Sequence, residues 1–75
     1  MSAEVRSLGE AYPEEQARCR ELIERYQELA KLPGVNVSFA VAGIKDVLRR
    51  ADRAAIEQDT VAMLRIYQEM KEIES

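Results

Sequence analysis

Apolar residues recur at helical spacing along the stretch from Ile44 to Ile73. Two stripes repeat every three or four positions, as on one face of a helix: Ile44, Val47, Leu48, Ala51 and Ala55, then Met63, Leu64, Tyr67 and Met70. Glu57, Gln58 and Asp59 separate the stripes, and Asp59 can accept hydrogen bonds from the free N–H groups of a following helix. The pattern predicts a helical hairpin, with helices over about 38–57 and 60–73.

A further helix is predicted upstream, over about 13–31. Tyr12-Pro13-Glu14-Glu15 is a typical helix start, because proline suits the first turn and acidic side chains complement the positive end of the helix dipole. A stripe then follows: Cys19, Leu22, Ile23, Tyr26, Leu29 and Ala30. Pro33 and Gly34 end the helix. Residues 1–11 have no clear period and are expected to form a loosely ordered arm, although Ser7 and Glu10 have the spacing of a capping box.

Three helices of comparable length, joined by short loops, predict one all-α domain spanning residues 1–75. We expect a small antiparallel three-helix bundle built on the helical hairpin. The chain is 47% hydrophobic and 33% charged, which is ordinary for a folded helical domain. A chain of this length buries little core, so a partner, including a second copy of the chain, is plausible.

Residues 35–42 allow two interpretations. Val35-Asn-Val-Ser-Phe-Ala-Val-Ala42 alternates with a period of two, as a half-buried strand does, and such a strand would have to pair with another molecule across a two-fold axis. The helical alternative makes Asn36 or Ser38 the N-cap of the second helix. Gly43 would then lie inside that helix, where it allows a neighbouring helix to approach closely.

Charge and composition exclude several classes of function. The net charge of −3 argues against a protein that holds polyanions. The chain has one cysteine, Cys19, so no disulfide forms within it, and a cytoplasmic location is the default expectation. The N-terminus lacks the apolar core of a signal peptide and no apolar run is long enough to span a membrane, so we expect no membrane association.

No set of residues indicates catalysis. The chain has no histidine, which removes the commonest general base and metal ligand. Cys19 lies on an apolar stripe, where a buried, inert thiol is expected. Paired glutamates such as Glu69 and Glu72 are common on solvated helix surfaces, and the isolated glycines form no phosphate-binding loop. We therefore expect a protein that is not an enzyme and that binds no cofactor or metal.

A basic ridge on the second helix is a candidate contact surface. It consists of Lys45, Arg49 and Arg53, one turn apart, with Arg50 beside them. Followed by a tight turn, the ridge invites comparison with a helix-turn-helix. However, the recognition helix normally follows the turn, and here that helix is mostly acidic among its charged residues. The ridge is therefore expected to be a solvated face or to contact an acidic helix of another subunit, and nucleic-acid binding is the less favoured alternative.

The third helix is apolar around much of its circumference, which is unusual for a helix that is wetted on one side. Its surplus face, Ile66, Met70 and Ile73, is the candidate surface for a second chain. In the alternative, the N-terminal arm folds over these three residues.

Three segments resemble small uncharacterised proteins carried by phages and prophages of Gram-negative bacteria. They are Glu15-Gln-Ala-Arg-Cys-Arg-Glu-Leu-Ile23, Val47-Leu-Arg-Arg-Ala-Asp-Arg-Ala-Ala-Ile56 and Asp59-Thr-Val-Ala-Met-Leu-Arg-Ile-Tyr-Gln-Glu-Met70. The chain departs from the resemblance over Pro33–Ala42. The resemblance carries no catalytic motif and implies only an accessory role in a mobile element.

Together these features predict a non-enzymatic protein-interaction protein, an adaptor or accessory protein of a phage or prophage. Its expected partner is a second copy, forming a homodimer, or a host or phage protein. Two alternatives stay open at this point: a small DNA-binding regulator that uses the basic ridge, and an inhibitor of a host protein.

Overall fold

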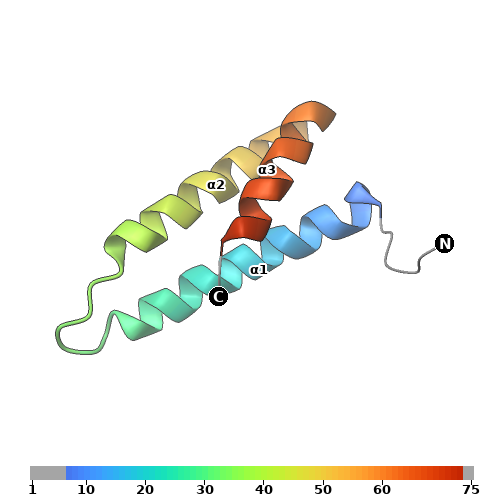
Figure 1. Ribbon diagram of the computed structural model, residues 1–75. Coiled ribbons are helices and arrows are strands. Elements are labelled where there is room, and N and C mark those ends of the chain that lie inside the picture. Colours follow the sequence, from blue (N-terminus) through green and yellow to red (C-terminus); the bar gives the residue numbers. More distant parts are fainter. Residues whose placement is uncertain (1–6, 74–75) are drawn as a thin grey trace.

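The computed structural model describes residues 7–73, and these form three α-helices with no β-strand among them (Figure 1). Helix α1 spans Leu8–Leu29, α2 spans Ser38–Glu57 and α3 spans Thr60–Glu72. α1 and α2 run antiparallel as a long hairpin, α3 folds back along α2, and each helix packs against the other two. The predicted all-α three-helix bundle is confirmed. None of the described helices is long and apolar enough to cross a membrane.

Helix α1 begins earlier than predicted. Ser7 is its N-cap, and the Ser7 hydroxyl accepts a hydrogen bond from the Glu10 backbone N–H at 3.3 Å. The predicted start at Pro13 is therefore wrong, and Pro13 lies inside the helix. Of the predicted loose arm, residues 7–11 belong to α1 or its cap, whereas residues 1–6 lie outside the described part of the chain.

Burial of Tyr12 explains why the helix continues through a proline. Tyr12 is only 1% exposed, and its hydroxyl donates a hydrogen bond of 2.8 Å to the Ala51 carbonyl of α2. A proline inside a helix lacks the N–H that would bond to the preceding turn, which weakens the helix at that point. Packing of an aromatic side chain and a buried hydrogen bond offset that loss.

Helix α2 begins at Ser38, so the strand alternative for residues 35–42 is wrong. The N-cap is Val37, which provides no side-chain hydrogen bond. Asn36 instead accepts from the Ser38 backbone N–H at 3.1 Å and from the Ser38 hydroxyl at 2.8 Å, so neither predicted cap residue is the N-cap itself. The helical conformation buries Val41 and Ile44 against the hairpin, which an unpaired strand could not do.

The tight turn between α2 and α3 is confirmed. Gln58 adopts the left-handed conformation, with φ 57° and ψ 36°, and ends α2. Asp59 is the N-cap of α3, and its carboxylate accepts a hydrogen bond from the Ala62 backbone N–H at 3.1 Å. Gln58 and Asp59 alone therefore reverse the direction of the chain between α2 and α3.

The core lies where all three helices meet. Its buried members come from every helix: Tyr12, Cys19, Leu22, Ile44, Leu48, Ala51, Ala54, Ile66 and Met70. In the part of the chain that the structure describes, no buried side-chain polar atom is left without a hydrogen-bond partner. The core is therefore small, and the buried polar side-chain atoms around it have hydrogen-bond partners.

Candidate functional site

The predicted interface on α3 lies in the chain's own core. Met70 is fully buried, Ile66 is 7% exposed, and Ile73 packs against the same cluster. The prediction that these three residues form a free surface is wrong, because they pack into the core that α3 shares with α1 and α2. Leu8, from the segment expected to be a loose arm, packs against the core cluster, whereas residues 1–6 of that arm lie outside the described part of the chain. The exposed apolar residues of α3 are on its other side: Val61 and Leu64.

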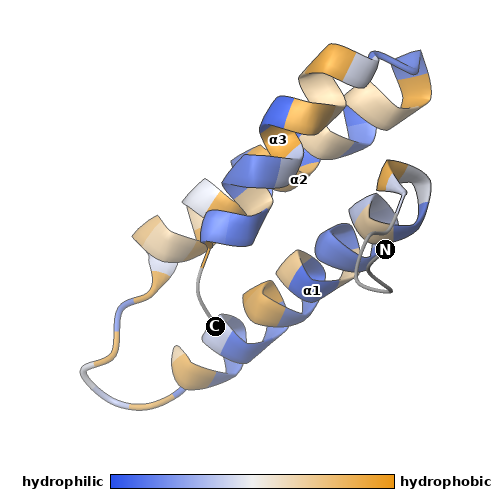
Figure 2. Ribbon diagram, turned by 45° about the vertical axis from the view of Figure 1, so that its right-hand side comes forward, coloured by the Kyte–Doolittle hydropathy of each residue, from blue (hydrophilic) through white to orange (hydrophobic). Residues whose placement is uncertain are grey.

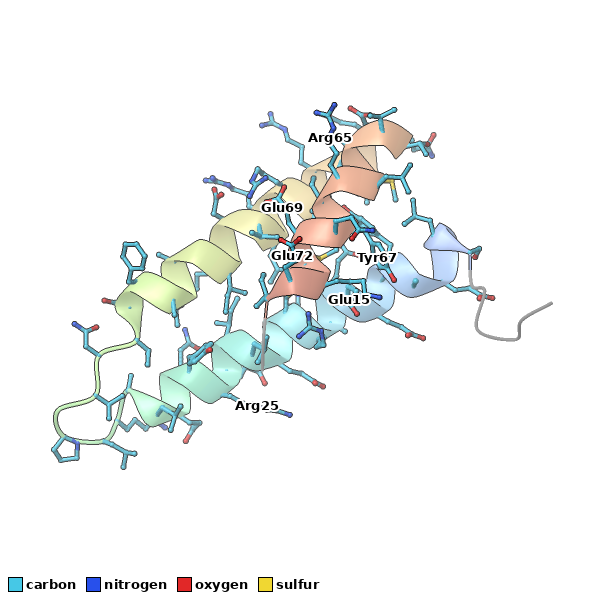
Figure 3. The ribbon with its side chains drawn as sticks, viewed as in Figure 1. Glu15, Arg25, Arg65, Tyr67, Glu69 and Glu72 are labelled. Carbon is cyan, nitrogen blue, oxygen red and sulfur yellow. The ribbon has the colours of Figure 1, made fainter. Side chains whose placement is uncertain are left out.

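The basic ridge of α2 is largely neutralised. Arg49 pairs with Asp46, and Arg53 pairs with Glu57 at 3.4 Å. Arg50 points the other way, toward α3. It pairs there with Glu69 at 2.9 Å, and this hydrogen bond raises the pKa of Arg50 above its usual value. Figure 3 labels Glu69 on α3.

Lys45 is the ridge member that makes no ion pair within residues 7–73. The structure therefore does not bring the four cations of the ridge together on one free surface. Binding of a phosphate backbone depends on a cluster of cations that are not already paired with carboxylates, and the ridge does not provide one.

Among residues 7–73, the groups with catalytic potential are the thiol of Cys19 and the carboxylates. Cys19 is fully buried, and this burial raises the pKa of its thiol, so the reactive thiolate is disfavoured. Within residues 7–73, no cluster of three or more potential ligand residues is arranged to hold a metal ion. Two depressions of about 570 and 400 Å³ are each lined by residues of a single helix, α1 and α2 respectively, so they are surface hollows rather than clefts between elements. A third hollow, between α2 and α3 and bordered by Arg50 and Ile66, has a volume of about 170 Å³.

The groove between α1 and α2 is only partly filled by α3. α3 has 13 residues, whereas α1 has 22 and α2 has 20. Two contacts mark where α3 ends along the hairpin: Arg50 pairs with Glu69, and Arg18 donates a hydrogen bond to the Met70 carbonyl. Figure 1 shows α3 beside the half of the hairpin that is remote from the α1–α2 loop. The half next to the loop consists of two helices with no third helix over them.

Apolar and charged residues together continue the α3-facing edges of both helices into this uncovered half. Asp46 lies beside Gly43 and Phe39 on α2, and Arg25 lies beside Leu29 on α1. Gly43 and Phe39 lie two and three helical turns before Arg50, so they share its edge of α2. Leu29 lies three turns after Arg18 and shares that residue's edge of α1. Phe39 is 93% exposed and Leu29 is 45% exposed. A Cβ atom added to Gly43 would meet nothing within 4 Å, so the space above it is open.

We call this surface the loop-end face. It comprises the residues on the two edges and two exposed apolar residues of the connecting loop: Leu29, Leu32, Val35, Phe39 and Gly43. Hydrophobic residues recur along the ribbon around this loop (Figure 2). The surface therefore combines exposed apolar side chains of both helices and the connecting loop with the charged residues Arg25 and Asp46 on the same helix edges.

The opposite side of the hairpin is polar. There Asp52 of α2 accepts hydrogen bonds from Gln16 and Arg20 of α1, at 2.8 and 2.9 Å. Continuing these edges two turns toward the loop brings in Lys45 and Gln27, which are polar and exposed. On the side that α3 partly covers, the same extension brings in Gly43 and the exposed Arg25, and the two sides differ in the exposed apolar side chains of Phe39 and Leu29.

The sequence patterns alone did not single out the loop-end face, because Phe39 lies in the stretch 35–42 that they left open between strand and helix. The available signal was the difference in length between the predicted helices. A third helix of 14 residues is too short to cover two helices of 19 and 20 residues, since each residue adds about 1.5 Å. The apolar residues beyond its end therefore had to remain uncovered.

No family model, curated protein or solved structure matches the chain. The comparisons therefore transfer neither a fold name nor a function.

Proposed function

We propose that this chain is a non-enzymatic interaction protein that binds another protein through the loop-end face. The observation that carries the proposal is the 93% exposure of Phe39 on the exposed edge of α2. Burying a side chain of this size contributes about 2–3 kcal/mol. Monomeric proteins rarely leave contiguous apolar surface exposed unless it serves binding.

The distribution of charge supports binding to protein rather than to nucleic acid. The arginines of the basic ridge are paired with Asp46, Glu57 and Glu69, and the whole chain carries a net charge of −3. Phosphate binding draws on clustered cations that are free of such partners. An accessory role in a phage or prophage, which the sequence resemblance implies, is compatible with a small binding protein of this kind.

Three versions of the tagged chain test the proposal in a lysate of the native host: the wild type, Phe39→Asp and Leu64→Asp. Leu64 is the matched control, because it is an exposed leucine on the outer side of α3, away from the loop-end face. We expect the wild type and Leu64→Asp to retain the same protein in a fixed ratio, with or without nuclease. Phe39→Asp should lose that protein, because a buried carboxylate at the interface is costly.

Equal retention by all three versions would contradict the proposal, since the loop-end face would then be dispensable. Loss of every bound species after nuclease treatment would also contradict it and would favour a nucleic-acid partner. Circular dichroism on the purified variants controls for folding. Both substituted positions are exposed, so both variants should keep the helical spectrum of the wild type.

A further inference from the structure

We infer that α3 is a strap that opens as a unit from the α1–α2 hairpin, about the two-residue turn at Gln58 and Asp59, and that this opening exposes the thiol of Cys19. The hairpin stays folded in the open form. The strap lies outside the loop-end face, so its opening is independent of the proposed function.

Contacts between α1 and α2 hold the hairpin together without α3. The Tyr12 hydroxyl donates a hydrogen bond to the Ala51 carbonyl at 2.8 Å. On the side of the hairpin away from α3, Asp52 accepts hydrogen bonds from Gln16 and Arg20. None of these contacts is made by a residue of α3, so all of them can persist while α3 is detached.

α3 is attached through fewer buried residues than the other two helices. It contributes two, Ile66 and Met70, whereas α1 contributes four and α2 contributes five. Its outer side carries Val61 and Leu64, which are 63% and 52% exposed. Local opening has its lowest free-energy cost where few apolar side chains are buried, so α3 is the helix that opens before the whole chain unfolds.

Two polar contacts join α3 to the hairpin at the end of the helix that is remote from the turn. Arg18 donates a hydrogen bond to the Met70 carbonyl, and Arg50 pairs with Glu69 at 2.9 Å. The Arg50 and Glu69 side chains are each 42% exposed, so water can replace this ion pair when the helix moves. At the opposite end, Gln58 adopts the left-handed conformation, which is unfavourable for a residue with a Cβ atom, and a change in its backbone dihedrals supplies the hinge.

Cys19 lies on α1 between the contacts that this helix makes with α2 and with α3. It is preceded by Arg18, which contacts α3, and followed by Arg20, which contacts α2. Successive helical residues are about 100° apart, so the Cys19 side chain points between these neighbours into the core, where it is fully buried in the same cluster as Ile66 and Met70. Detachment of α3 therefore uncovers one side of Cys19. Since Cys19 is the only cysteine of the chain, thiol labelling reports this one position.

The test is the rate at which an aromatic disulfide reagent labels Cys19 in the folded full chain, at increasing urea concentrations. The thiolate of Cys19 attacks the reagent, which forms a mixed disulfide and releases a coloured thiolate. When α3 recloses faster than the reagent reacts, the rate follows the population of the open form. We expect labelling below the unfolding transition to depend on urea less steeply than global unfolding does, because opening of α3 exposes only part of the buried surface.

Two variants separate opening of α3 from unfolding of the whole chain. Ile66→Val removes one buried methylene group from α3, so it should raise the labelling rate about 2–10-fold. Tyr12→Phe is the control, because it weakens a contact that the open form keeps, and it should leave the labelling rate unchanged. Both variants should lower global stability in urea unfolding followed by circular dichroism, so only the labelling rates distinguish them.

The other outcomes overturn the inference. Labelling that has the urea dependence of global unfolding, and that both variants accelerate alike, would show that Cys19 is exposed only when the whole chain unfolds. A labelling rate that Ile66→Val leaves unchanged would show that Cys19 is reached by opening of a different element.

Discussion

At the scale of single residues, Tyr12 connects the first helix to the second. Its ring is buried in the core, and its hydroxyl donates a hydrogen bond to the backbone carbonyl of Ala51. Burial, together with the negative charge of Asp52, raises the pKa of the Tyr12 hydroxyl. One side chain thus contributes packing, a buried hydrogen bond and a dependence of stability on pH.

We predict that Tyr12→Phe lowers the free energy of unfolding by about 1 kcal/mol at neutral pH, because one buried hydrogen bond is lost. The matched control is Tyr26→Phe. Tyr26 is half-buried, and its hydroxyl makes no hydrogen bond within residues 7–73, so this variant should change stability by less than about 0.5 kcal/mol. Urea unfolding followed by circular dichroism measures both values. Equal effects of the two substitutions would refute a specific role for the Tyr12 hydroxyl.

The raised pKa of Tyr12 also predicts the direction of a pH effect. The unfolded chain ionises this group near pH 10, whereas the folded chain resists ionisation, so the contribution to stability is complete below about pH 10. It should be lost as pH rises above that value. The wild type should therefore lose more stability between pH 9 and pH 11 than Tyr12→Phe does. The same loss in both proteins would contradict this prediction.

At the scale of elements, the rotation of α3 determines which of its apolar residues form the core. Met70 and Ile66 face the α1–α2 hairpin, whereas Leu64 and Val61 face outward. The ion pair between Arg50 and Glu69 lies at the edge of this contact and is partly exposed on both sides, so it contributes about 1 kcal/mol at most. Apolar burial is therefore the main term that holds α3 in place.

We predict that Met70→Ala lowers the free energy of unfolding by about 2–5 kcal/mol, because it leaves a cavity in a fully buried position. Leu64→Ala should cost less than about 0.5 kcal/mol, since Leu64 is 52% exposed. Total stabilities of small domains start near 5 kcal/mol, so Met70→Ala can be largely unfolded at 37 °C. Thermal and urea unfolding measure both variants. A larger cost for Leu64→Ala would mean that α3 packs through its other face.

Sequence patterns predicted some elements better than others, for physical reasons. The boundary between α2 and α3 was predictable because Asp59 supplies a local capping hydrogen bond. The start of α1 was not, because burial of Tyr12 against α2, 39 residues away along the chain, overrides the local preference of Pro13. The core-facing side of α3 was not predictable either, because the sequence of a helix that is apolar around much of its circumference does not indicate which side faces the core.

At the scale of the whole molecule, the chain is extended for its size. Its radius of gyration is 14.0 Å, and its principal dimensions are 48 × 28 × 14 Å. A compact chain of 75 residues is expected to have a radius of gyration of about 11 Å. The long α1–α2 hairpin, which projects beyond α3, is consistent with this shape. The loop-end face is thus a consequence of the relative lengths of the helices, which no single motif encodes.

The charge of the whole molecule leads to the last prediction, which concerns the DNA-binding alternative. The arginines of the basic ridge are paired with carboxylates, and the net charge is −3, so within residues 7–73 the ridge offers only Lys45 as an unpaired cation to displace counterions from DNA. We expect no binding to duplex DNA tighter than about 100 µM at 0.15 M salt, which is the weak limit of ordinary non-specific binding. Lowering the salt to about 50 mM should not produce a complex in fluorescence anisotropy.

The variant for this test is the double substitution of Arg49 and Arg53 by alanine. Both side chains are exposed and lie on the free side of the ridge, so their removal should leave the fold intact. If the wild type did bind DNA and the double variant reduced the salt slope by about two units, the two arginines would be contacting phosphates. That result would overturn the expectation, because it would require DNA to displace Asp46 and Glu57 from their ion pairs. An unchanged anisotropy for both proteins is the outcome that their paired charges predict.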